Sequence, residues 1–165
     1  MRKPTGPTPP SDNQLAAYLD RCRALIKEHG HMVQSVFPDA HTHVPGFAYT
    51  IGLSQSGGAE LVTIGLPADT ATYFLNTVAQ RLATTPIADH DDITEIANTA
   101  LRLRTIPCEE MLPHMRVARA LLIAPRAIIR QVIWPDPSGR FPGDPAYKYQ
   151  LTQSPDELIS DRRAH

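Results

Sequence analysis

Two short alternating segments, residues 47–53 and 60–66, constrain the fold more than any other part of this sequence. In the first, large apolar residues alternate with small ones, which is the period-two pattern of a β-strand. The linker between them, residues 54–59, is rich in serine and glycine and favours a β-hairpin. Gly52 and Gly65 leave open positions in these strands, where another backbone, a large side chain or a ligand can approach closely.

The strongest helix signal lies at residues 12–29. Ser11 and Gln14 have the spacing of a capping box, and Gly30 supplies a left-handed stop. Apolar residues between these signals recur at intervals of three and four, as on one face of a helix. The stripe consists of Leu15, Leu19, Cys22 and Ile26, with Tyr18 and Leu25 beside it.

The remaining elements complete an alternating order of helices and strands. A second helix is expected after Asp69, which can cap it, with an apolar stripe of Ala71, Phe74, Leu75, Val78 and Leu82. A helical segment is expected over 109–122, in which Pro113 either lies in a first turn or breaks the helix. Residues 93–98 fit either a helical turn or a short strand. Further strands are expected at 31–37, 101–106 and 127–134, an edge strand at 147–151, and a short last helix after Ser154. This order predicts an α+β fold with a mainly antiparallel sheet of about five strands and helices packed on one side.

The length of 165 residues fits one domain, which we expect over 11–153. Residues 1–10 contain four prolines and no apolar periodicity, so they are expected to form a disordered arm. Residues 154–165 are expected to form a tail or short helix. The arginines of the 101–106 strand are expected to face water.

Composition narrows the class of protein. The formal net charge of −1 does not show the basic excess of a nucleic-acid binder. No apolar stretch reaches the ~20 residues that cross a bilayer, and the N-terminus lacks the apolar core of a secretory signal. The two cysteines, Cys22 and Cys108, are expected to stay reduced in a cytoplasmic protein.

The histidines raise the question of a metal site. His29 and His31, and also His41 and His43, are separated by one residue, and two imidazoles at such a spacing can bind one metal ion. However, His29 ends a helix, the second pair lies in a loop, and no spacing completes a known metal motif. The sequence therefore predicts no metal site and leaves open whether these histidines meet.

Polar residues of the hairpin form the first group of candidate binding residues. Glu60 follows a Gly-Gly turn, and its carboxylate can fix a polar ligand or simply end a strand in solvent. Tyr49, Thr50 and Gly52 belong to the neighbouring strand. Neither a Gly-x-Ser-x-Gly elbow nor a phosphate-binding loop is present, which argues against a serine hydrolase and a P-loop nucleotide site.

A second group lies in residues 131–142, where polar and aromatic residues are densest. Gln131 interrupts an apolar strand and needs hydrogen-bond partners if it is buried. Asp136 stands between two prolines and can pair with Arg140 across a turn. Together with Trp134, these residues either fasten a loop to the sheet or present a carboxylate, a guanidinium and an aromatic face to a ligand.

Several of these segments together resemble an uncharacterised bacterial family catalogued as domain of unknown function 4262. The resemblance spans about residues 15–153 and rests on His29-Gly30, residues 47–53, Glu60-Leu61, residues 65–67 and residues 131–142. The sequence departs from the family pattern at His31, Ala59 and Gly143. The resemblance implies the fold and its boundaries and a bacterial or phage origin, but no established activity or cofactor.

Three hypotheses follow for the function. The first is a small accessory domain that binds a small molecule or a protein partner through the hairpin and the Trp-Pro-Asp loop. The alternative is a hydrolase-like enzyme in which Glu60 or Asp136 acts as general base and Arg140 anchors an anion. A third is a flavin or similar cofactor on the face of Tyr49, Thr50 and Gly52. Homodimerisation through an open sheet edge fits all three.

Overall fold

The computed structural model describes residues 8–96, 98–121 and 126–159. The expected arm over 1–10 and the expected tail over 154–165 therefore lie partly outside the described residues. Within the described part, no helix has both the length and the apolar composition to cross a membrane.

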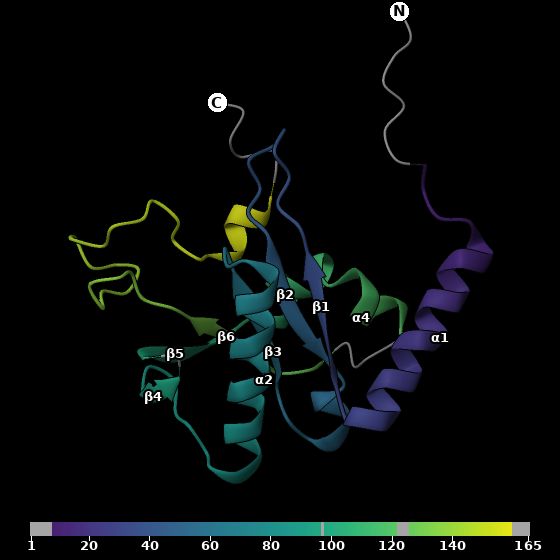
Figure 1. Cartoon of the computed structure of the whole chain (residues 1–165), viewed down its shortest axis with the longest axis horizontal. Helices are drawn as coiled ribbons and strands as arrows, with labels where there is room; N and C mark the ends of the chain where they lie inside the picture. The colour runs from purple at the N-terminus through teal and green to yellow at the C-terminus, as the bar shows by residue number, and fades with distance from the viewer. Residues whose placement is uncertain (1–7, 97, 122–125, 160–165) are drawn as a thin grey trace, which may run out of the picture.

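The core of the structure is a sheet of six strands in the order β1-β2-β3-β6-β5-β4 (Figure 1). Only β3 and β6 are parallel, and the other neighbours are antiparallel. The strands are β1 (Met32–Val36), β2 (Phe47–Ile51), β3 (Glu60–Ile64), β4 (Asp92–Ile96), β5 (Thr99–Ile106) and β6 (Ile129–Ile133). The predicted α+β class with a mainly antiparallel sheet is confirmed. The sheet has six strands rather than about five, because the ambiguous segment at 93–98 contributes β4.

The predicted hairpin is formed by β2 and β3, in which Tyr49 lies opposite Val62. A short 3-10 helix, η1 (Leu53–Ser56), connects the two strands. Every residue of β2 and β3 is buried, so both faces of the sheet need to be covered here. Gly52 and Gly65 lie directly after these strands instead of inside them.

Helix α1 (Asp12–His29) has the predicted bounds, and its capping box is formed. The Ser11 hydroxyl accepts from the backbone of Gln14 at 3.3 Å, and the Gln14 side chain accepts from the backbone of Ser11 at 2.9 Å. Of the predicted stripe, however, only Cys22 and Ile26 are buried. Helix α1 therefore lies beside β1 as an outlying element (Figure 1).

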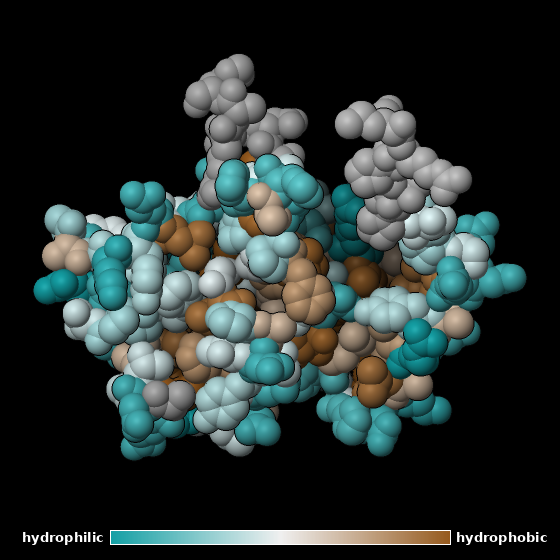
Figure 2. Space-filling view, turned by 45° about the horizontal axis from the view of Figure 1, so that its top comes forward, coloured by the Kyte–Doolittle hydropathy of each residue, from teal (hydrophilic) through white to brown (hydrophobic). Residues whose placement is uncertain are grey.

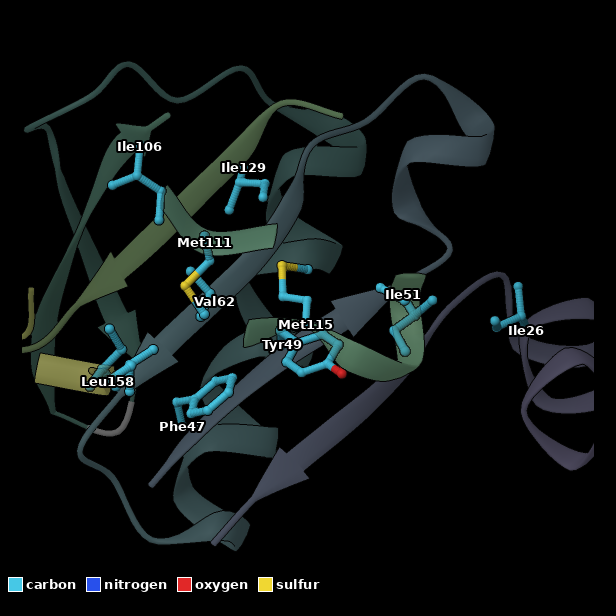
Figure 3. Packing of buried hydrophobic residues seen from close by; sticks show 12 residues of the cluster. Ile26, Phe47, Tyr49, Ile51, Val62, Ile106, Met111, Met115, Ile129 and Leu158 are labelled. Carbon is cyan, nitrogen blue, oxygen red and sulfur yellow. The ribbon is translucent and has the colours of Figure 1, made fainter. Parts of the chain in front are cut away.

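Helices cover both faces of the sheet, so the expectation that they lie on one side is wrong. Helix α2 (Ala68–Thr84) packs on one face with its predicted stripe, while three short helical segments cover the other. These segments are α3 (Cys108–Met111), η2 (Leu112–His114) and α4 (Arg116–Ala120). Met111 of α3 and Met115, between η2 and α4, pack against β2, β3 and β6 (Figure 3). Both alternatives for Pro113 apply, because it lies in the first turn of η2 and the segment is divided there into short pieces.

Three local expectations have different outcomes. Asp69 does not cap α2, because Pro67 occupies the cap position and Asp69 lies in the first turn. Residues 147–151 form no strand. The capping signal at Ser154 is confirmed: its side chain accepts from the backbone of Asp156 at the start of η3 (Pro155–Leu158).

Gly52 offers a test of how tightly the hairpin is seated on α1. Its φ is +119°, and an added Cβ would lie 2.8 Å from the Gly30 carbonyl oxygen and 2.9 Å from Ile26. We expect Gly52→Ala to lower the free energy of unfolding by about 2–6 kcal/mol, because strained φ and overpacking each cost about 1–3 kcal/mol. Urea unfolding of the variant measures this change.

Gly57→Ala is the matched control, because Gly57 also has a positive φ of +86° but faces open space. It should cost about 1–3 kcal/mol, the conformational term alone. Equal losses in the two variants would contradict the close contact between Gly52 and α1.

Candidate functional site

The structure separates the candidate residues into two groups at opposite ends of β3. Thr50, Gly52 and Glu60 surround the turn at the beginning of β3, whereas Trp134 follows β6 and lies at the other end, where its indole donates to Ile64. Four residue steps of about 3.3 Å separate Glu60 from Ile64, so the groups are about 13 Å apart along the strand. This is too far for Glu60 and Trp134 to belong to one hydrogen-bonded site.

Tyr49 belongs to the core and not to a surface. Its side chain is fully buried, its ring stacks on Phe47 at 5.9 Å, and its hydroxyl accepts from the backbone of Val117 at 3.1 Å (Figure 3). Burial raises the pKa of this phenol to about 12. Thr50 is equally buried. Two of the three residues that the cofactor hypothesis names, Tyr49 and Thr50, are therefore covered by the protein itself.

Glu60 is 1% exposed, and its carboxylate fixes the turn between β2 and β3. One oxygen accepts from the Thr50 hydroxyl at 2.6 Å. The other accepts from the backbone of Gly52 at 2.9 Å and from the backbone and hydroxyl of Ser54 at 3.0 and 2.8 Å. Both oxygens are thus occupied by donors of the protein. The arrangement holds the turn and leaves no free general base.

Asp136 plays the same part in the Trp-Pro-Asp loop, which we define as residues 134–149. One carboxylate oxygen accepts from the backbone of Ser138 and Arg140, and the other from the backbone of Lys148, all at 2.9 Å. Burial acts to raise the pKa of Asp136, but these backbone hydrogen bonds outweigh it and hold the pKa below its ordinary value. The loop is therefore folded around a buried carboxylate.

The expected ion pair between Asp136 and Arg140 is not among the ion pairs of the described residues. The Arg140 guanidinium instead donates to the backbone oxygen of Ala146 at 3.2 Å and is exposed. The two residues do meet, through the backbone of Arg140.

Gln131 is fully buried and finds its partners in two residues that the sequence did not single out. Its amide oxygen accepts from Arg104 at 2.6 Å, and its amide nitrogen donates to the backbone oxygen of Gln153. The Gln153 side chain in turn accepts from the backbone nitrogen of Trp134 and donates to its oxygen, at 3.2 and 2.7 Å. The expectation that Gln131 needs partners is met by a network that fastens the chain after the loop to β6.

Arg104 was expected to face water, but its Nε atom is buried and has no hydrogen-bond partner among the described residues. Arg102, two positions earlier, stacks on the ring of Phe141 at 3.9 Å and pairs with Asp92 at 2.6 Å. Their alternation in the sequence correctly places both on one face of β5, but it does not reveal that both side chains are half-buried there.

Two neighbouring pockets of about 390 and 250 Å³ adjoin the Trp-Pro-Asp loop, and we call them together the apolar groove. The larger lies between the loop that joins β1 to β2 (residues 37–46) and the start of α2. The smaller lies between α2 and Trp134. Leu66 lines both. Their lining is mostly apolar and includes Val36, Phe37, Phe47, Ala71, Phe74, Trp134, Tyr149 and Leu151.

The candidate histidines do not converge. His31 bonds Asn76 of α2 at 2.9 Å, while the backbone of His41 donates to Asp39 in the loop beyond the far end of β1. Across the described residues, no group of three or more histidine, cysteine or acidic side chains is placed to hold a metal ion.

One comparison with known proteins gives a match. A protein-family model described as Domain of unknown function (DUF4262) matches residues 25–148. The range contains the whole sheet and nearly all of the Trp-Pro-Asp loop, and it leaves out most of α1 and Gln153. No curated protein and no solved structure matches this chain.

The role of Glu60 can be tested by removing its charge with little change in shape. Glu60→Gln replaces one acceptor oxygen by a donor, so the Thr50 hydroxyl loses its acceptor while the other contacts can persist. We expect the free energy of unfolding to fall by about 1–3 kcal/mol, the cost of an unmade buried hydrogen bond. Urea unfolding measures the change, and Glu110→Gln, at an exposed position of α3, should leave stability unaltered. A stable Glu60→Gln protein would show that the turn does not depend on this carboxylate.

Asp136 should make the loop sensitive to acid. Because the pKa of this carboxyl is lowered from 3.8 in the folded protein, its contribution to stability is present above pH 4 and is lost as the pH falls through the folded-state pKa. We expect the fluorescence of Trp134, the only tryptophan, to report loop release in this acid range. Asp136→Asn should weaken the loop at pH 7 and reduce its acid dependence. If Asp136→Asn keeps the wild-type acid transition while Asp91→Asn removes it, the acid-induced release of the loop does not come from Asp136.

Proposed function

The chain belongs to the family described as Domain of unknown function (DUF4262), and we propose that it is a binding domain that holds an apolar segment of a protein partner. The observation that carries this proposal is the apolar groove, whose two pockets meet at Leu66 beside the Trp-Pro-Asp loop. Figure 2 shows brown side chains at the surface in the middle of the view, with teal side chains around them.

Large apolar side chains at this groove are exposed to a degree that is unusual for residues near a core. Phe37 is 77% exposed, Tyr149 39% and Val36 37%. Contiguous apolar surface of this kind marks interaction sites, and aromatic residues dominate the energetics of protein interfaces. A partner that covers Phe37 and Tyr149 would remove this surface from water.

The chemistry of the lining favours binding over reaction. Asp136 is its one ionisable carboxylate, and both of its oxygens already accept from the backbone. The indole nitrogen of Trp134 is likewise engaged with the Ile64 carbonyl at 2.9 Å. The groove therefore offers shape and apolar area, which suits two side chains of an extended segment that enter adjacent pockets.

The groove is also preorganised, which lowers the entropic cost of binding. Asp136 fixes the Trp-Pro-Asp loop, and Leu151 fills the space above Gly65, where an added Cβ would overlap it. Trp134 packs against the ring of Tyr149 at a centroid distance of 5.7 Å. The walls are thus held in place without a ligand.

A substitution that fills the smaller pocket tests this proposal. Thr70 lines that pocket from the first turn of α2, and Thr70→Trp should occupy it. Peptides selected from a displayed random library on the wild-type chain should carry two closely spaced apolar residues. Their Kd, measured by fluorescence polarisation, should rise at least about tenfold with Thr70→Trp, which equals about 1.4 kcal/mol.

Gln80→Trp is the matched control, because it adds the same side chain on the exposed part of the same helix. It should leave the Kd unchanged. Peptide binding that survives Thr70→Trp would contradict the proposal. So would a co-purified small molecule, seen by native mass spectrometry, that Thr70→Trp displaces.

A further inference from the structure

We infer that a second site, between α1 and the turn that joins β2 to β3, binds a small organic anion with an apolar body. The site is a pocket of about 480 Å³, within the usual range of 300–1,000 Å³ for small-molecule sites. It lies at the beginning of β3, so it is distinct from the apolar groove at the other end of that strand. It does not depend on the proposed function.

The floor of this pocket is apolar and comes from three parts of the chain. Ile26 contributes from α1 and Leu121 from the end of α4, while Gly30 and Gly52 present backbone. A Cβ added at Gly52 would lie within 3 Å of the Gly30 carbonyl oxygen and of the Ile26 side chain. The turn after β2 and the end of α1 therefore meet closely behind the pocket. An aliphatic or aromatic body fits such a floor.

The rim carries positive charge and a free amide. Arg23 and Lys27 stand one helical turn apart on α1, and Gln55 and Ser56 come from η1. Among the described residues that line the pocket, none carries a carboxylate. Among the described residues, Lys27 has no ion pair, and neither Lys27 nor Gln55 makes a side-chain hydrogen bond. Arg23 pairs only with the neighbouring Asp20, at 3.0 Å on an exposed surface where such pairs are weak.

The balance of charge in the pocket favours an anion. Helix α1 ends here, and its carbonyl end carries the equivalent of about half a negative charge. The side chains of Arg23 and Lys27 bring two positive charges, of which the Asp20 carboxylate offsets one, and the remaining positive charge still exceeds that of the helix end. An anionic head group would therefore sit at the rim, with Gln55 as an additional donor, while the apolar body covers Ile26 and Leu121.

The wall of the pocket is held rigid by a carboxylate that the ligand does not touch. Glu60 binds the backbone of Gly52 and both the backbone and hydroxyl of Ser54, which fixes the turn that carries Gln55 and Ser56. Glu60 is thus a positioning residue for the pocket. This gives the buried carboxylate a role in binding although its oxygens are inaccessible.

The fluorescent probe 8-anilinonaphthalene-1-sulfonate, an aromatic body with an anionic head, tests the inference on the full chain. We expect saturable binding of one probe per chain, with a Kd that rises at least about tenfold in Lys27→Glu and in Arg23→Glu. N-phenyl-1-naphthylamine, a similar body without the charge, should bind wild type more weakly than the sulfonate. It should also respond much less to Lys27→Glu.

Arg21→Glu is the matched control, because it makes the same change of charge at an exposed position of α1 outside the lining of the pocket. It should leave the Kd for the sulfonate probe unchanged, and so should Thr70→Trp, which fills the other groove. Equal weakening by Arg21→Glu and Lys27→Glu, or binding that only Thr70→Trp removes, would overturn the inference. Loss of peptide binding in Thr70→Trp bears only on the proposed function, so the two can fail separately.

Discussion

The buried carboxylate of Glu60 is the constraint on which the centre of this structure depends. Burying a charge costs several kcal/mol unless hydrogen bonds compensate for it, and here no cation is among its partners. Four donors from Thr50, Gly52 and Ser54 supply that compensation. The backbone N–H of Glu60 donates to the carbonyl oxygen of Ile128 at 2.9 Å, so the turn is fixed where β3 begins to pair with β6. One side chain thus ties the hairpin to the only parallel pair of the sheet.

Buried polar side chains also stabilise the other end of β3 and β6, next to the Trp-Pro-Asp loop. Asp136 gathers three backbone N–H groups, and the amides of Gln131 and Gln153 are engaged on both sides. Irregular segments cannot satisfy their backbone by a ladder of strand or helix bonds, so buried polar side chains do it instead. Three of the predicted ligand-binding candidates, Glu60, Gln131 and Asp136, therefore support the backbone of a turn and a loop. That turn and that loop carry the two surfaces for which we propose binding.

Local sequence patterns predicted the elements whose cause is local. Helix α1 has its predicted ends because Ser11, Gln14 and Gly30 cap it, and α2 shows its predicted stripe. The pairing of β3 with β6 joins residues nearly 70 positions apart, as in the Glu60–Ile129 register, and no local pattern encodes it. Burial of both faces of β2 and β3 explains why helices lie on two sides.

The candidate residues show the same limit. Gln131 was recognised because an amide in an apolar strand needs partners, but its partners Arg104 and Gln153 are distant in sequence. The alternation of arginines in β5 predicts that Arg104 lies on the face opposite the leucines. The same alternation occurs whether that face is exposed to solvent or covered by other residues, so it does not predict the burial of Arg104. Glu60 at the start of a strand likewise has the pattern of a solvated end, and only the fold of the turn places four donors around it.

The separation of the two proposed surfaces determines how they can work together. They lie toward opposite ends of β3, which is about 13 Å long, and the hydrogen bonds that support one share no residue with those of the other. Effects at sites this far apart without shared partners are normally additive. The strand between them is buried and is paired on both sides, with β2 and with β6. A small anion at the turn would therefore not switch partner binding on or off. The two occupants proposed for these surfaces would instead bind independently, at opposite ends of one strand that is paired on both sides.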